Sequence, residues 1–130
     1  AAGLIREAAN RWGDRILVVL DDQRVAYQEV ERRSAEMARS LLASGVVRGS
    51  RLGLLAPNSP DWVVAWLAAT RIGAVTTLLS TYARPRELGW ALGHSGVEVL
   101  LTANGYLGRH YPVELETAIP GLVGQRHGEI

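Results

Sequence analysis

The sequence predicts an α/β fold built on a parallel βαβαβ sheet with flanking helices, preceded by an N-terminal helix and a β-hairpin. Three short apolar runs, at 52–56, 74–79 and 97–102, alternate with two segments of helical pattern. This alternation is typical of strands joined by crossover helices, which form parallel sheets. With 130 residues, the chain has room for one domain that buries roughly two thirds of its unfolded surface.

Composition and charge exclude several classes of protein. Hydrophobic residues make up 48% of the chain and the net charge is +1, which favours neither nucleic acid nor an anionic membrane as a partner. No apolar run approaches the roughly 20 residues of a membrane span, and polar residues near the start interrupt any signal peptide. The sequence has no cysteine, which excludes disulfides and thiolate metal sites. We therefore expect a cytoplasmic protein.

All 14 basic residues are arginine. A bias of codon usage toward arginine explains this composition without any functional cause. Whatever the cause, this chain cannot supply a lysine amine for a covalent step, nor a P-loop lysine.

The first third of the sequence predicts two helices with a hairpin between them. Residues 3–12 have the apolar spacing of a short helix. The run 16–20 and the return at 25–27, separated by four polar residues, are typical of a hairpin. A long amphipathic helix follows over 28–44, and Gly45 suits the position after its end. The apolar stripe of the first helix is Leu4, Ile5, Ala8 and Trp12, and that of the second is Val30, Ser34, Met37, Ala38, Leu41 and Leu42.

The first crossover helix has clear signals at both ends. Ser59 is placed to cap it, and Pro60 occupies its first position. Asp61 adds a negative charge where the helix dipole favours one. The helix continues to about residue 72 and Gly73 ends it. It is apolar on almost all sides, so we expect it to be buried on most of them.

The second crossover helix is predicted from Pro85 to His94, with Gly96 after its end. A last helix is expected over 106–119, although Pro112 interrupts it early. Right-handed crossovers place both connecting helices on one face of the sheet unless the strand order reverses, and the sequence leaves that order open. Residues 121–130 contain three glycines and no periodicity, so an irregular tail is expected.

The loop after the first strand, APNSPDW (56–62), argues against a dinucleotide site. Such a site needs GxGxxG there, whereas this loop has no glycine and two prolines that remove backbone donors. No P-loop, HExxH, GxSxG or CxxC motif occurs anywhere in the chain. The three histidines, His94, His110 and His127, do not have the spacing of a pair of metal ligands on a helix.

The loops after the second and third strands are better candidates for a ligand. Residues 80–86 offer hydroxyls, an aromatic ring and two arginines, and residues 104–110 have a similar character. Both loops follow the carboxyl end of a strand, which is a common ligand position. Together they could hold a phosphate-bearing ligand, although loops of this composition are more often solvated surface with exposed arginines.

Three segments, in order, resemble the N-terminal part of the adenylate-forming enzymes, the superfamily of acyl-CoA synthetases and AMP-binding ligases. VAYQEV (25–30) resembles the core motif LTYxEL. The stretch 45–75 resembles the block GVxxGDxVaillpNspew…lAxlraGAv, and RPRELGWALGHSGVEVLLT (84–102) resembles the block that follows it. The resemblance covers residues 4–122. The segments STYARPREL and YLGRHY are most similar to those of bacterial fatty-acyl or aryl-CoA ligases.

The resemblance implies a two-step ligation, as in fatty acid metabolism. A carboxylate attacks ATP to form an acyl-adenylate, and the thiol of CoA then displaces AMP, so ATP, Mg²⁺ and CoA are implied for the whole enzyme. The family's phosphate loop, YGxTE-like segment, ribose-holding aspartate and C-terminal lysine are absent from this chain. Residues 1–130 are therefore expected to be one partial domain, with no catalytic residue or cofactor of its own. Its partner would be the remainder of the ligase.

One binding role carries over from acetyl-CoA synthetase-like members of the family. Their CoA nucleotide lies against the loop after the second core motif and against arginines after the next strand. These places correspond here to Ser80, Thr81 and Tyr82, and to Arg109, which would lie near the CoA phosphate. The usual glycines of that loop are absent in this chain.

A second hypothesis is a free-standing, non-catalytic module that binds a partner through an exposed apolar face. A helix as apolar as 60–72 needs cover on several sides, so a missing cover would favour a homo-oligomer. A third hypothesis, a nucleotide-binding Rossmann protein, is disfavoured by the loop over 56–62.

Overall fold

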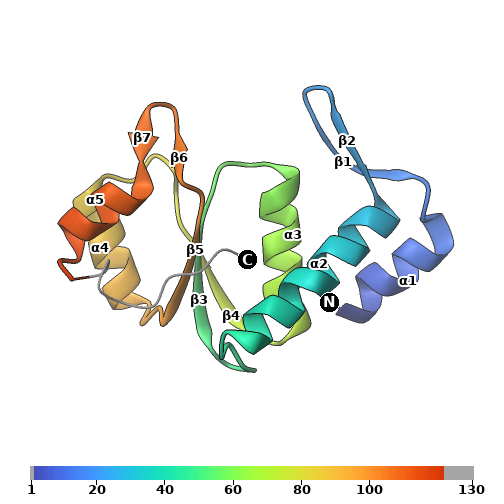
Figure 1. Cartoon of the computed structure of the whole chain (residues 1–130), viewed down its shortest axis with the longest axis horizontal. Helices are drawn as coiled ribbons and strands as arrows, with labels where there is room; N and C mark the ends of the chain where they lie inside the picture. Colours follow the sequence, from blue (N-terminus) through green and yellow to red (C-terminus); the bar gives the residue numbers. More distant parts are fainter. Residues whose placement is uncertain (1, 122–130) are drawn as a thin grey trace. The chain divides into compact units, whose positions relative to one another are not determined.

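The fold is α/β, as the alternation of apolar runs predicts, and Figure 1 shows it as a computed structural model. The structure describes residues 2–121, so the expected tail lies outside them from residue 122 on. The helices are α1 (Ala2–Trp12), α2 (Tyr27–Ala43), α3 (Pro60–Arg71), α4 (Pro85–His94) and α5 (Tyr111–Ala118). The strands are β1 (Ile16–Leu20), β2 (Gln23–Ala26), β3 (Arg51–Leu55), β4 (Val75–Leu78), β5 (Val99–Thr102), β6 (Gly105–Tyr106) and β7 (Arg109–His110).

The chain divides into two compact units. Of the described residues, the first unit contains 2–50 and 58–75, and the second contains 51–57 and 76–121. Within the described residues, none of the helices combines the length and the apolar character needed to cross a membrane.

The first unit contains α1, α2, α3 and the hairpin of β1 and β2. The two strands are antiparallel, and Leu20 pairs with Gln23, so only Asp21 and Asp22 form the turn. The predicted turn of four residues is therefore too long, and Tyr27 begins α2 instead of ending a strand. Asp21 has a positive φ of 52°, the left-handed conformation that a two-residue hairpin turn needs.

The core of the first unit is made by its helices and the hairpin. Its buried residues are Ile5, Val30, Val64 and Leu67, and the partly buried residues around them are Leu17, Val18, Val25, Tyr27, Met37 and Val63. The stripe that α2 buries is Val30, Ser34, Ala38 and Leu41. This stripe is narrower than predicted, because Leu42 is 50% exposed. In α1, Leu4 is 74% exposed and only Ile5 is fully in the core.

The start of α3 follows the sequence signals. The Ser59 side chain accepts a hydrogen bond from the backbone N–H of Trp62 at 3.1 Å, and Pro60 lies in the first turn. Gly73 follows the end with a positive φ of 75°, which glycine adopts without steric cost. Six of the twelve residues of this helix are buried, whereas Trp66 is 38% exposed, so the helix is less completely buried than its all-round apolar sequence predicts.

Replacing Ser59 by alanine should lower the free energy of unfolding by about 1 kcal/mol, because one N–H of the first turn loses its acceptor. Ser59→Asp is the matched control, since aspartate restores the acceptor and favours the helix dipole. Urea denaturation of the three proteins measures the difference. Equal losses in both variants would mean that the hydroxyl does not act as a cap.

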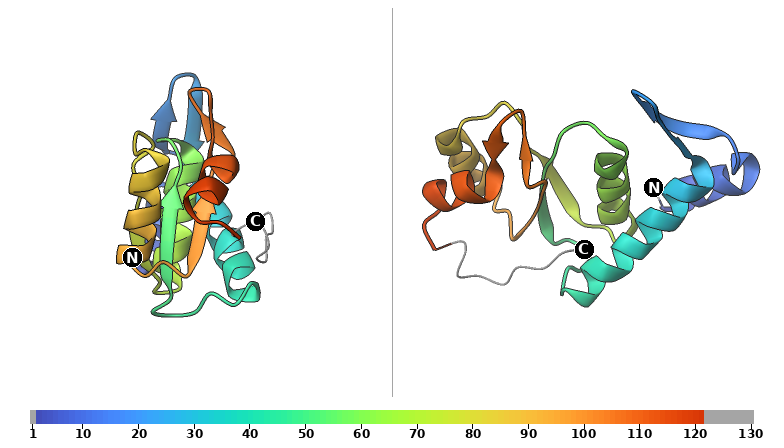
Figure 2. Two further views of the ribbon diagram at one scale, coloured as in Figure 1. Left: turned by 90° about the vertical axis from the view of Figure 1, so that its left-hand side faces the viewer. Right: turned by 45° about the horizontal axis from the view of Figure 1, so that its top comes forward.

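The second unit contains a three-stranded sheet in the order β4-β3-β5. β3 and β5 are parallel, in a register that runs from Leu52 opposite Val99 to Leu55 opposite Thr102. The order therefore reverses around β3, which answers the question that the sequence leaves open. Figures 1 and 2 show α4 and α5 side by side. The buried residues of this unit are Leu55, Leu79, Leu88, Leu92, Tyr111 and Leu115.

The prediction of a last helix over 106–119 is wrong in its first part, where β6 and β7 form a small antiparallel hairpin. Leu107 and Gly108 make its turn with positive φ angles of 49° and 77°, as in the tight turns that join two strands. A Cβ atom at Gly105 would collide with the carbonyl oxygen of Arg109, so only glycine fits there. Pro112 lies in the first turn of α5 and opens that helix instead of interrupting it.

Candidate functional site

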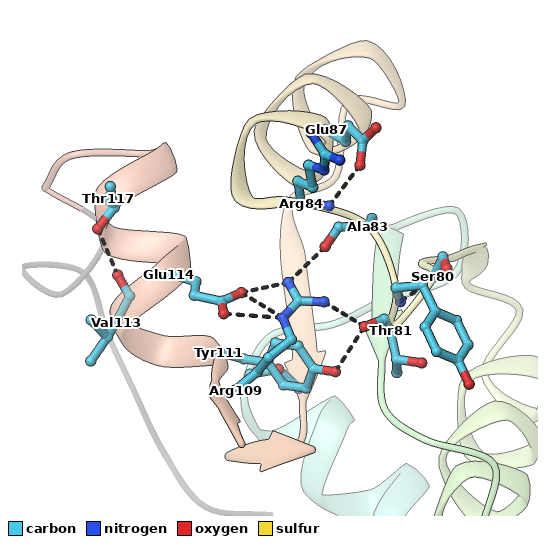
Figure 3. A network of polar contacts seen from close by, with 12 residues as sticks. Ser80, Thr81, Ala83, Arg84, Glu87, Arg109, Tyr111, Val113, Glu114 and Thr117 are labelled. Carbon is cyan, nitrogen blue, oxygen red and sulfur yellow. Dashed lines mark hydrogen bonds and ion pairs between the residues drawn. The ribbon is translucent and has the colours of Figure 1, made fainter. Parts of the chain in front are cut away.

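The two loops that the sequence favours are joined by one arginine side chain. Arg109, on β7, reaches back to the loop after β4 (Figure 3). Its guanidinium donates from Nη1 to the carbonyl oxygen of Thr81 and from Nη2 to that of Ala83. It also makes a two-pronged ion pair with Glu114 of α5, with Nε–Oε1 at 3.0 Å and Nη2–Oε2 at 2.5 Å. Residues 80–84 are thus tied to β7 and α5.

Tyr111 reinforces this tie from the core. Its side chain is fully buried, and its hydroxyl donates to the carbonyl oxygen of Thr81 over 3.4 Å. The guanidinium of Arg109 lies over the ring, 5.2 Å from the centroid, in a cation–π arrangement. We call the group of Arg109, Tyr111 and Glu114, with the two carbonyls that it holds, the Arg109 clasp.

The loop is also ordered by its own hydrogen bonds. The backbone N–H of Ala83 donates to the carbonyl of Ser80, and that of Tyr82 donates to the Ser80 hydroxyl. The N–H of Arg84 donates to the carboxylate of Glu87 at 2.6 Å. Glu87 therefore occupies the amino end of α4, so that the backbone donor at Arg84 is already engaged by a carboxylate.

Burial and charge shift the pKa values within the clasp. The hydrogen bonds from Arg109 hold the pKa of Glu114 below its usual range, and Glu114 raises the pKa of Arg109 in turn. Burial is the main cause that raises the pKa of the Tyr111 hydroxyl. Each shift favours the ionised pair beside a neutral tyrosine.

The predicted site residues differ in their exposure to solvent and in how many of their polar groups are already hydrogen-bonded. Ser80 is exposed, Thr81 is half-buried and Tyr82 is 78% exposed. The guanidinium of Arg109 is already hydrogen-bonded within the protein. One N–H of Nε, one of Nη1 and two of Nη2 donate to protein oxygen atoms. These are four of the five donors that a guanidinium offers. Thr81 meets Arg109 through its carbonyl, so its hydroxyl is not part of the contact.

Other candidates from the sequence have structural explanations. Trp90 and His94 stack on each other along α4, with ring centroids 4.6 Å apart. Asp61 pairs with Arg33 of α2. Across the part of the chain that the structure describes, no three histidine or acidic side chains come together in a way that could hold a metal ion. The sequence does not point to Glu114 or Tyr111, because neither matches a motif and the contacts they make span up to 30 residues of sequence.

The ion pair in the clasp should make stability depend on pH. Because the pKa of Glu114 is lowered in the folded protein, its contribution is present above its unfolded pKa of about 4.3. The contribution is lost as the pH falls from there through the lowered folded value. Above pH 6 we expect Glu114→Gln to cost about 1 kcal/mol. Urea titrations of both proteins at several pH values should find that this difference shrinks toward about pH 3, whereas a constant difference would exclude the ion pair.

Comparison with known proteins gives a consistent result. The sequence model of a family described as AMP-binding enzyme matches residues 5–127. The acyl-CoA ligase SID4 of Ajellomyces capsulatus is 34% identical over 76% of this chain and 16% of its own length. The medium/long-chain-fatty-acid–CoA ligase FadD6 of Mycobacterium tuberculosis is 32% identical over 75% of this chain and 16% of its own.

A third relative, the acetyl-coenzyme A synthetase of Aeromonas hydrophila, is 32% identical over 87% of this chain and 18% of its own length. This chain therefore spans less than a fifth of each of these three relatives.

Solved structures agree on the fold. The N-terminal subdomain of NpsA from Klebsiella oxytoca, in complex with anthranilyl-AMSN, has a TM-score of 0.77 at 22% identity, over 80% of this chain and 27% of that one. A benzoate CoA ligase from Burkholderia xenovorans has a TM-score of 0.73 at 23% identity, over 78% of this chain and 21% of that one. At these identities, the two structural similarities show a shared arrangement of helices and strands.

Proposed function

Since the chain belongs to the family of AMP-binding enzymes, we propose that it forms part of a ligase that joins a carboxylic acid to CoA. In the proposed reaction, the acid attacks ATP to give an acyl-adenylate and pyrophosphate, and the CoA thiol then displaces AMP. The observation that carries this proposal is the family match over nearly the whole chain. ATP, Mg²⁺ and CoA would serve the whole enzyme, which we place in the cytoplasm.

Within that enzyme we assign this chain a supporting role. It has no lysine and none of the motifs that carry the family's chemistry. It spans less than a fifth of three curated relatives. The remaining groups of the active site would come from the remainder of the ligase, and residues 2–121 would supply a scaffold and one binding loop.

We assign the CoA nucleotide to the region of Ser80, Thr81, Tyr82 and Arg109. Three features support this assignment. The loop follows the carboxyl end of β4, where ligands of open parallel sheets commonly bind. Its backbone is already ordered by hydrogen bonds. The Tyr82 ring is 78% exposed, so a base or pantetheine could pack on it without a side chain having to move.

Replacing Tyr82 by alanine in the full-length enzyme tests this assignment. Trp90→Ala is the matched control, because Trp90 is also a largely exposed aromatic residue, on α4 outside the loop. The KM for CoA should rise about tenfold in the Tyr82 variant, while the KM for ATP stays constant, because one aromatic contact to a base is worth about 1–3 kcal/mol. An unchanged KM for CoA in the Tyr82 variant, or an equal rise of this KM in both variants, would contradict the assignment of the CoA nucleotide to this loop.

A second candidate function is a non-catalytic module that associates through apolar surface. Several large apolar side chains favour it, since Leu78 is 52% exposed and Trp90 is 68% exposed. The sequence places this apolar surface on α3, but among the large apolar side chains of that helix in the described residues only Trp66 is exposed, at 38%. Size-exclusion chromatography at rising concentration tests whether the chain associates with itself: a chain that stays monomeric would leave a homo-oligomer without support.

A further inference from the structure

We propose that Arg109 is a positioning residue for CoA binding and not a ligand of a CoA phosphate. The geometry points to a guanidinium that fixes the backbone of residues 80–84, so that Ser80 and Tyr82 are held ready for the ligand. This inference rests on the proposed function, because it concerns how the same loop is prepared for CoA.

The strand order explains why the loop needs such a tie. In the order β4-β3-β5, β3 separates the strand before residues 80–84 from the strand before β6 and β7. No sheet hydrogen bonds can therefore join the loop after β4 to the hairpin after β5. Arg109 makes this connection by donating to two carbonyls of the loop, those of Thr81 and Ala83. Tyr111 adds a third bond, to Thr81.

The charge of Arg109 is already compensated. Glu114 accepts from both Nε and Nη2, so the pair presents little net positive charge to an approaching phosphate. A phosphate would have to displace the carboxylate or a loop carbonyl to gain a comparable two-pronged contact. Glu87 similarly occupies the amino end of α4. The arrangement suits a neutral, rigid support better than an anion site.

A rigid loop lowers the cost of binding, because side chains and backbone need not be ordered when the ligand arrives. The planar fork of arginine is essential to this role, since it can hold two carbonyls and a carboxylate at fixed angles. A lysine at this position would keep the charge but could not reproduce that geometry. Arg109→Lys therefore separates the two roles: it preserves an attraction for phosphate and removes the support of the loop.

The test uses the full-length enzyme with Arg109→Lys, the milder Glu114→Gln, and Arg86→Lys as a control at an exposed position of α4. Two quantities are measured: hydrogen exchange at the amides of Tyr82 and Ala83, and the KM for CoA, for 3′-dephospho-CoA and for ATP. In Arg109→Lys we expect exchange at the two amides to rise about tenfold, because the loop opens more often. The KM for both thiols should rise by the same factor, with an unchanged KM for ATP.

Other results of the exchange and KM measurements would contradict specific parts of the proposal. A KM that rises for CoA but not for 3′-dephospho-CoA would overturn the proposal, because Arg109 would then recognise the phosphate. Unchanged amide exchange would overturn it as well, since the loop would not depend on the clasp. Faster exchange with no change for either thiol would support the clasp and overturn the assignment of the loop to CoA. If Arg109→Lys fails to fold, Glu114→Gln should give the same pattern with smaller factors.

Discussion

Replacing Tyr111 by alanine is expected to lower the free energy of unfolding by about 3–5 kcal/mol, as for other fully buried aromatic side chains. Tyr111 has no exposed surface and lies in the core of the second unit beside Leu88 and Leu115. Alanine would leave a cavity that the packed residues around it can only partly fill. The carbonyl of Thr81 would also lose one of its two donors. Urea denaturation at neutral pH measures the loss.

Tyr111→Phe is the matched control for this prediction. It keeps the ring and removes only the hydroxyl, whose bond to Thr81 is long at 3.4 Å. We expect it to cost less than about 1 kcal/mol. If phenylalanine cost as much as alanine, the hydroxyl rather than the packing of the ring would dominate. If alanine cost less than about 1 kcal/mol, Tyr111 would not be a core residue.

The second large effect is expected at the ion pair between α2 and α3. Arg71 and Glu31 form a two-pronged contact, with Nη1–Oε2 at 2.5 Å and Nη2–Oε1 at 3.0 Å. Their side chains are only 10% and 19% exposed. Arg71→Met would leave a nearly buried carboxylate without its main partner. We expect a loss of about 2–4 kcal/mol, slightly below that of fully buried pairs because some solvent reaches Glu31.

Two further variants separate burial from charge. Arg33→Ala removes the partner of Asp61, whose side chain is 81% exposed, so it should cost less than about 1 kcal/mol. The double variant Arg71→Met with Glu31→Leu should recover most of the stability that Arg71→Met loses, because no unpaired charge remains. A double variant as unstable as Arg71→Met alone would contradict this explanation, as would an equal loss at Arg33.

The elements that the sequence predicts well are those with local signals at their ends. α3 and α4 begin at prolines and are followed by glycines with positive φ, and both start where predicted. Their boundaries depend on backbone groups within one turn, which a short stretch of sequence determines. The predicted apolar stripe of α2 is correct at its centre and wrong at Leu42. Tertiary packing, and not the helical period, decides how wide a face of the helix its neighbours cover.

The parts that the sequence does not predict depend on contacts between distant residues. β6 and β7 contain two residues each, too few for a period to be visible. The positive φ of Leu107 in their turn is also an uncommon conformation for leucine. The sequence points to Arg109 but not to its role, because Thr81 is 28 residues away and Glu114 belongs to no motif.

We propose that this chain supports, without catalysing, the formation of a CoA thioester. The most direct test is to measure acid-dependent release of AMP, with ATP, Mg²⁺, CoA and a panel of carboxylic acids. The full-length gene product and the 130-residue chain are assayed in parallel. We predict that the full-length protein releases AMP and forms a thioester with at least one acid, and that the 130-residue chain does neither. AMP release by the 130-residue chain, or none by the full-length protein with any acid, would contradict this account.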